Sequence, residues 1–306
     1  MISVIIPSRN ERFLPHTIHG LLDRARGEVE VIAILDGDQK EPKLRKDPRI
    51  RILRHSKPLG MRACTNDGVA VAQGEHLMKC DAHCIFDYGY DQKLVESCEE
   101  HTLVIPRRYA IDGTRWVVNG ARGPVDYEHF NWPFYKEGHI GLYTIPWQER
   151  RNERYSEEEY RVDDQMAFQG SCWLTSAEHF RDVIGRLDEE YFGMWAGEPQ
   201  EMGLKTWLSG GRVVVNKRTW YAHLHKGRRW KAYSKNRGDI AVGMARVVDY
   251  WMNDQWEGRK HDFDWLVEKF WPIPTWPENW KDRTVPDWEE VLRVNAGQSA
   301  AGRDSK

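Results

Sequence analysis

One short stretch of this sequence carries two side chains that can bind a metal ion. Asp81 and His83 are separated by a single residue and follow the apolar run at residues 76–80. In an extended turn, side chains two residues apart point the same way, so the carboxylate and the imidazole can face one ion. This pair suits Mn²⁺ or a similar divalent cation, which would bridge nucleotide phosphates and stabilise a departing diphosphate. Alone, the triplet Asp81-Ala82-His83 is more typical of a turn aspartate beside a solvated surface histidine, so the interpretation depends on the surrounding elements.

Those elements follow the rhythm of a parallel sheet. Short apolar runs predict buried strands at residues 2–6, 29–35, 50–53 and 76–80. Apolar residues at helical spacing predict helices between them, at 14–22 and 59–73. Strands alternating with helices predict an α/β fold with crossover connections, and such sheets bind ligands at the carboxyl ends of their strands. Asn10, Asp36 and Asp81 all fall at such ends.

The later part of the chain predicts an insertion and an extension. Residues 107–164 are irregular and rich in Trp, Tyr, Gly and Pro, which is typical of a functional loop, here expected on the acceptor side. Strands are predicted at 103–105, 167–175 and 213–215, and helices at 90–98, 177–184 and 200–208. We expect one domain over residues 1–240, followed by a Trp-rich helical extension and a flexible tail over 241–306.

Composition excludes several classes of protein. The 306 residues contain no apolar stretch of about 20, so we expect no membrane span. No basic, signal-like segment precedes the first strand, so no secretory signal is expected. The five cysteines form no Cys-x-x-Cys pair, which favours reduced thiols. We therefore expect a cytoplasmic protein, in the host cytoplasm if it is virus-encoded, and its oligomeric state stays open.

Seven short blocks follow one another over about residues 2–226. They lie at residues 5–11, 35–37, 59–62, 81–84, 195–201, 207–211 and 221–225. Their shared order and spacing resemble those of glycosyltransferases of the GT-A fold, in particular the family 2 enzymes and the polypeptide N-acetylgalactosaminyltransferases. The resemblance implies a mostly parallel, Rossmann-like sheet flanked by helices, and a UDP-sugar as co-substrate.

Site roles follow from this resemblance. It implies Mn²⁺ or Mg²⁺ bound by Asp81, His83 and His223, with His225 as the alternative third ligand. It also implies that a group of residues binds the UDP-sugar, namely Pro7, Asn10, Glu11, Asp36, Arg62, Arg228 and Arg229. Asp36 is expected to accept hydrogen bonds from the base or the ribose.

Two glutamates are the candidate catalytic residues. In inverting relatives an acidic residue of the block at 195–201 takes the proton from the acceptor hydroxyl. Here Pro199 stands where a catalytic Asp or Asn is usual, so either Glu198 or Glu201 is left as the base. A retaining mechanism without such a base stays open, as does a purely structural role at a helix N-terminus.

A basic segment suggests an anionic acceptor. Residues 202–238 contain ten Lys or Arg and no Asp or Glu, in a chain of net charge −2. The segment fits a loop that closes over the diphosphate, and it also fits contact with phosphates and stacked bases. We place four acceptor contacts at Trp173, Trp195, Trp230 and Lys231. The best guess for the acceptor is 5-hydroxymethylpyrimidine in DNA, as in phage-type DNA modification; protein Ser/Thr or a saccharide is the alternative.

Other functions fit less well. A dinucleotide oxidoreductase needs Gly-x-Gly-x-x-Gly after the first strand, and a nucleotidyltransferase needs a Gly-rich loop there. This chain has Ser8-Arg9-Asn10-Glu11 instead. A non-catalytic module that binds sugar or nucleic acid remains as a further alternative, and slow hydrolysis of a UDP-sugar would separate it from an enzyme.

Overall fold

Both faces of the first two strands are buried, as their unbroken apolar runs require. In the computed structural model, which describes residues 1–37, 41–133, 140–156, 158–227 and 237–282, β1 (Ile2–Ser8) and β2 (Val29–Asp36) pair in parallel. Alternate residues of β1 serve opposite layers: Val4 joins one hydrophobic cluster and Ile5 the other. The sheet therefore needs a helical layer on each face.

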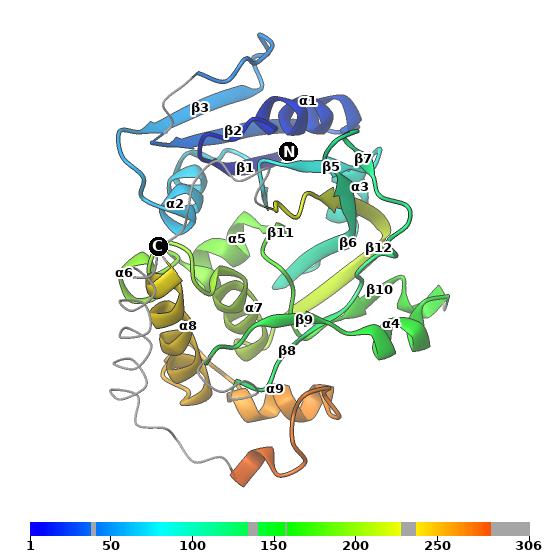
Figure 1. Cartoon of the computed structure of the whole chain (residues 1–306), viewed down its shortest axis with the longest axis vertical. Helices are drawn as coiled ribbons and strands as arrows, with labels where there is room; N and C mark the ends of the chain where they lie inside the picture. The colour runs from blue at the N-terminus through cyan, green and yellow to red at the C-terminus, as the bar shows by residue number, and fades with distance from the viewer. Residues whose placement is uncertain (38–40, 134–139, 157, 228–236, 283–306) are drawn as a thin grey trace.

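The described chain forms one ten-stranded sheet and a separate two-stranded one. The main order is β10-β12-β6-β11-β4-β1-β2-β3, with β5 beside β12 and β7 beside β6 (Figure 1). β11 runs antiparallel to β4 and β6, while the β1, β2, β3 and β4 group and the β6–β12 pair are parallel. The other strands of this sheet are β3 (Ile50–His55), β4 (His76–Cys80), β5 (Cys84–Phe86), β6 (Thr102–Asp112), β7 (Val117–Val118), β10 (Val162–Asp164), β11 (Cys172–Ser176) and β12 (Arg212–His223). The predicted mostly parallel α/β sheet is confirmed.

Helices cover both faces of this sheet. α1 (Leu14–Arg24) and α3 (Tyr90–Val95) pack in one cluster, through residues that include Leu21 and Leu94. α2 (Met61–Val71) and α7 (Glu198–Leu208) belong to the other. Between β11 and α7 lie α5 (Ala177–His179), a π-helical turn (Phe180–Ile184) and α6 (Glu189–Phe192). The helix predicted at 177–184 is therefore present but is π-helical in its second half.

The insertion predicted to be irregular contains short regular elements. β6 continues to Asp112 and β12 to His223, well beyond the strands predicted at 103–105 and 213–215. Side-chain patterning did not reveal these extensions because they carry polar and aromatic residues. The other elements are β7 (Val117–Val118), β8 (Glu128–Phe130), β9 (Thr144–Pro146), α4 (Gln148–Arg154), a 3-10 turn (Glu158–Tyr160) and β10 (Val162–Asp164).

The Trp-rich helical extension packs onto the main body. It comprises α8 (Arg237–Met252), α9 (Phe263–Phe270) and a 3-10 turn (Trp280–Asp282), and Figure 1 shows α8 and α9 beside α7. Trp251, Trp276 and Trp280 share one hydrophobic cluster with Trp207. The boundary placed near residue 240 falls inside α8, and the division into 1–240 and 241–306 stays a prediction. Among the described helices, none has the length and apolar character to cross a membrane.

Candidate metal centre and its surroundings

Three strand ends bring the predicted metal ligands together. Asp81 follows β4, and His83 precedes β5, whose antiparallel pairing with β12 sets Cys84 opposite His223. His223 Nε2 lies 3.1 Å from Asp81 Oδ2 and 3.1 Å from His83 Nε2, and Asp81 Oδ2 lies 3.7 Å from His83 Nε2. The three atoms therefore converge on one point at the carboxyl end of β4.

The charge states of these side chains fit a divalent cation. Burial lowers the pKa of His223 to about 3, against the opposing effect of Asp81. Burial would raise the pKa of Asp81, but Lys79 and His223 outweigh it and hold that pKa well below the usual range. At neutral pH the centre therefore presents an ionised carboxylate and a neutral His223 imidazole. Two imidazole nitrogens 3.1 Å apart repel unless a proton or a cation lies between them, so these residues fit Mn²⁺ or Mg²⁺.

Of the two late histidines, His223 is the one that joins the centre. Arg108 donates a hydrogen bond to His225 Nε2 at 3.2 Å, so that lone pair is already used. The Arg108 guanidinium is held in turn by Glu128 at 2.7 Å. Burial, and then Arg108, lowers the pKa of His225, so the ring is a neutral acceptor for Arg108. The alternative in which His225 is the third ligand is not favoured by this arrangement.

The loop after β1 reaches the same centre. Glu11 Oε2 lies 3.2 Å from His83 Nδ1 and 2.6 Å from Lys226 Nζ. Burial would raise the pKa of Glu11, but His83 and Lys226 lower it further than burial raises it. Pro7 is half-buried near the end of β1, and Asn10 is exposed with a φ of 51°. Glu11 thus contacts a candidate metal ligand on the side away from the centre.

The Asp36 carboxylate interacts with neighbouring groups of the protein itself. Its Oδ1 accepts a hydrogen bond from the Leu59 backbone at 2.7 Å and lies 2.9 Å from His55 Nδ1, and Oδ2 accepts a hydrogen bond from the Gly60 backbone at 3.0 Å. Only 2% of Asp36 is exposed. The residue predicted to bind the base or ribose therefore mainly fixes the turn that leads into α2.

Arg62 and Glu201 are paired with each other inside the protein. Their side chains form a buried ion pair, with 0% and 1% exposure, and Arg62 Nη2 also donates to the Ala196 carbonyl at 2.5 Å. Glu201 further accepts from Lys205 Nζ at 2.8 Å. In this arrangement Arg62 has no surface for a diphosphate and Glu201 has none for an acceptor hydroxyl. The predicted donor role of Arg62 and the predicted base role of Glu201 do not match these positions, because two buried charges must neutralise each other.

Glu198 and Trp173 form a second buried contact. Trp173 Nε1 donates to Glu198 Oε1 at 2.7 Å, and neither residue has any exposed surface. Trp173 therefore cannot contact an acceptor as predicted, because its ring lies wholly within the core. Glu198 Oε2 has no hydrogen-bond partner among the described residues, and burial raises the pKa of this glutamate. Trp195 is half-buried, so part of its surface remains available to a ligand.

Lys79 is the residue of the site that the sequence interpretation missed. Its buried ammonium lies 3.1 Å from Asp81 Oδ1, donates to the Gly170 carbonyl, and is 4.0 Å from Glu198 Oε2. Burial would lower its pKa, but Asp81 and Glu198 raise it by more, so the side chain stays charged. A lysine inside an otherwise apolar strand, two residues before Asp81, was the available signal. The predicted contacts Arg228, Arg229, Trp230 and Lys231 lie outside the described residues.

Comparison with known proteins assigns the family. Residues 3–180 match the family described as Glycosyl transferase family 2, which is more than half of the chain. The chain belongs to glycosyl transferase family 2. This agrees with the resemblance drawn from the blocks between residues 5 and 84.

Curated relatives of this family 2 chain include vertebrate polypeptide N-acetylgalactosaminyltransferases. The Homo sapiens polypeptide N-acetylgalactosaminyltransferase 3 is 26% identical over 265 residues, covering 82% of this chain and 41% of the relative. The Xenopus tropicalis polypeptide N-acetylgalactosaminyltransferase 11 is 23% identical and covers 83% of this chain and 43% of the relative. The chain thus spans about two fifths of the length of these relatives.

Solved structures share the fold at low identity. GalNAc-T7 with UDP, GalNAc and Mn²⁺ superposes with a TM-score of 0.68 at 21% identity, covering 83% of this chain and 48% of that one. S. aureus TarS in complex with UDP-GlcNAc gives a TM-score of 0.53 at 15% identity, covering 84% and 68%. The predicted GT-A architecture is therefore confirmed as the fold class.

Proposed function

We propose that this protein transfers a sugar from a UDP-sugar to an acceptor hydroxyl, with Mn²⁺ or Mg²⁺ held by Asp81, His83 and His223. The observation that carries the proposal is the convergence of these three ligand atoms at the carboxyl end of β4 in a family 2 chain. Relatives named for sugar transfer, and a similar fold solved with UDP, GalNAc and Mn²⁺, support it. When bound, the ion would supply positive charge that stabilises the departing diphosphate.

The protein's own side chains would prepare this centre. Lys79 holds Asp81 Oδ1, which leaves Oδ2 to face the two histidines. Glu11 lies against His83 Nδ1, which favours the tautomer that directs the Nε2 lone pair inward. Asn10, Pro7 and Glu11 are the proposed donor contacts of the first loop. Asp36 would act on the donor chiefly by shaping residues 59–60.

For the base, we propose Glu198 rather than Glu201. Glu201 is neutralised by Arg62 and Lys205, and so it has little capacity to take a proton. Glu198 has a raised pKa and one oxygen without a hydrogen bond among the described residues, which are properties of a general base. The carboxylate lies beneath Gly170, where an added Cβ would collide with Oε2. Movement at Gly170 would therefore be required to admit an acceptor.

The acceptor that we expect from the charge pattern is 5-hydroxymethylpyrimidine in DNA. Lys226, a described member of the basic segment, lies 2.6 Å from Glu11 and so borders the centre. A cation at this position, beside the donor site, would meet the phosphates of a DNA acceptor. Ser or Thr of a polypeptide is the second candidate, because the curated relatives are named as polypeptide transferases.

One experiment tests both levels of this proposal. The protein is incubated with Mn²⁺, a panel of UDP-sugars, and three acceptors: hydroxymethylated duplex DNA, a Ser/Thr peptide and an oligosaccharide. Mass spectrometry should show sugar on one acceptor and none after chelation. Transfer to DNA should fall steeply with salt, because each neutralised phosphate releases counterions. Transfer to the peptide alone would decide for the second candidate. If the protein neither hydrolysed nor transferred sugar from any UDP-sugar, the proposed function would be rejected.

A further inference from the structure

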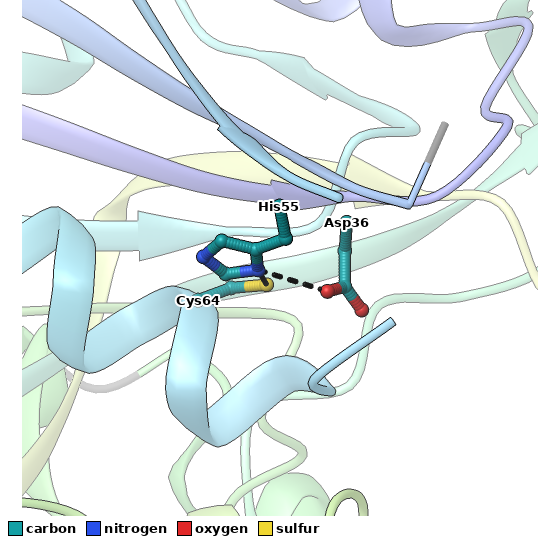
Figure 2. A group of neighbouring side chains, drawn as sticks. All are labelled: Asp36, His55 and Cys64. Carbon is teal, nitrogen blue, oxygen red and sulfur yellow. Dashed lines mark hydrogen bonds and ion pairs between the residues drawn. The ribbon is translucent and has the colours of Figure 1, made fainter. Parts of the chain in front are cut away.

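A second group of metal-binding side chains lies at the ends of β2 and β3. Asp36 and His55 are the last residues of these strands and are register partners, and Cys64 faces them from α2. One ligand atom from each of the three lies within 4.8 Å of the other two. Figure 2 shows Nδ1 of the imidazole facing the Asp36 carboxylate, with the sulfur of Cys64 beside the same nitrogen.

The distances suit coordination of a small divalent ion. His55 Nδ1 lies 2.9 Å from Asp36 Oδ1 and 3.8 Å from Cys64 Sγ (Figure 2). Tetrahedral zinc, with bonds of about 2.0 Å to O or N and about 2.3 Å to S, sets neighbouring ligand atoms roughly 3.3 to 3.6 Å apart. These two separations fall on either side of that range, and the ligand atoms of Asp36 and Cys64 lie within 4.8 Å of each other, so modest side-chain shifts would form the site.

The groups that orient metal ligands are also in place. His55 Nε2 lies 3.0 Å from Asp67 Oδ2, and a metal-binding histidine almost always donates its other ring N–H to such a carboxylate. Asp36 is held by the backbone N–H groups of Leu59 and Gly60. Asp67 is the most exposed member, and Asp36 and Cys64 are buried, so the cluster is shielded on its inner side.

We propose that Asp36, His55 and Cys64 form a second, zinc-type metal site, with Asp67 positioning His55. A thiol, an imidazole and a carboxylate together favour Zn²⁺ or Co²⁺, whereas the first centre lacks sulfur and suits Mn²⁺ or Mg²⁺. The three protein ligands leave one coordination position for water. Burial raises the pKa of the Cys64 thiol, and a bound ion would deprotonate it directly. The ion would tie β2, β3 and α2 together, and this site does not depend on sugar transfer.

Cobalt spectroscopy tests the site because only a thiolate ligand gives a near-ultraviolet charge-transfer band. The full chain is titrated with Co²⁺. We expect the band in the wild type, in His223→Gln, which alters the first centre, and in the matched control Cys98→Ser. The band should be absent in Cys64→Ser, which lacks the thiol. It should also be absent in His55→Gln, which keeps the thiol but lacks the imidazole ligand. Asp67→Asn should weaken Co²⁺ binding by about tenfold or more.

Circular dichroism establishes whether each variant is folded. If Cys64→Ser does not fold, His55→Gln still tests the site. A wild type without the band, or a band that persists in both folded variants, would overturn the site. A band that disappears in His223→Gln but persists in His55→Gln would assign the thiolate to the first centre, where Cys80 and Cys84 flank Asp81 and His83, and would also overturn it.

Discussion

His83 Nε2 and His223 Nε2 lie 3.1 Å apart although 140 positions separate them in the sequence. Their contact depends on one pairing, in which the short β5 runs antiparallel to the end of β12. The same pairing leaves His225 just beyond the end of β12, against Arg108. His223 therefore faces the candidate metal centre, whereas His225 contacts Arg108.

Replacing His223 should remove metal binding, whereas replacing His225 should not. An ion that binds only the folded state at 100 times its dissociation constant stabilises it by about 2.7 kcal/mol. We expect Mn²⁺ to raise the melting temperature of the wild type and of His225→Gln, and to have little effect on His223→Gln. Thermal unfolding with and without Mn²⁺ measures this. The reverse ranking of the two variants would show that His225 is the ligand.

Glu201→Gln should destabilise the fold. It leaves the buried Arg62 guanidinium without its counter-charge, and breaking a buried pair in this way costs about 3–5 kcal/mol. Urea unfolding measures the loss, and Glu190→Gln, an exposed glutamate nearby, serves as the matched control. Equal stability of the two variants would contradict the pairing of Arg62 with Glu201.

Glu198→Gln should separate catalysis from donor binding. If Glu198 takes the acceptor proton, transfer should fall by about 10²–10⁴-fold. The amide can still accept the hydrogen bond from Trp173, so the fold should be largely retained. UDP binding, measured by calorimetry, should change little. Wild-type transfer rates in Glu198→Gln would exclude it as the base and favour a retaining mechanism.

His179 should make stability depend on pH. Burial, and then His101, lowers the pKa of His179 to about 4, while its Nε2 lies 2.9 Å from Thr206 Oγ1. Because the unfolded chain takes up a proton near pH 6.5 and the folded chain does not, stability should be full above about pH 6.5 and fall towards pH 4, by at most about 3 kcal/mol. Urea unfolding of His179→Gln across this range should show a smaller loss than the wild type. The exposed His16→Gln should match the wild type, and if His179→Gln did so too, the assignment would be wrong.

The sequence predicted the strands and the grouping of the candidate metal ligands better than the surrounding contacts. Strand ends and ligand types are local properties, so Asp81 and His83 can be chosen from the sequence alone, whereas His223 was reached through the family resemblance. Partners of buried charges are not local. Nothing near Arg62 or Glu201 in the sequence reveals that each neutralises the other, and nothing near Trp173 reveals that its ring is covered. The site role of Lys79 was not predicted, because the apolar residues around it already indicate a buried strand. Its partner Asp81 is close in sequence, but Glu198 lies on a distant segment.

The pairing of Arg62 with Glu201 also bears on how the chain is made. These residues are 139 positions apart, and the Met61 backbone N–H likewise bonds to the Met194 carbonyl at 3.1 Å. On the ribosome the amino-terminal strands emerge first. α2 cannot reach its final packing, and Arg62 stays hydrated, until residues 194–201 have been synthesised. A nascent chain halted near residue 180 would hold Asp81 and His83 but lack the partners that seat α2. Such late, long-range closure slows folding and leaves the incomplete chain with surface exposed that the finished protein buries.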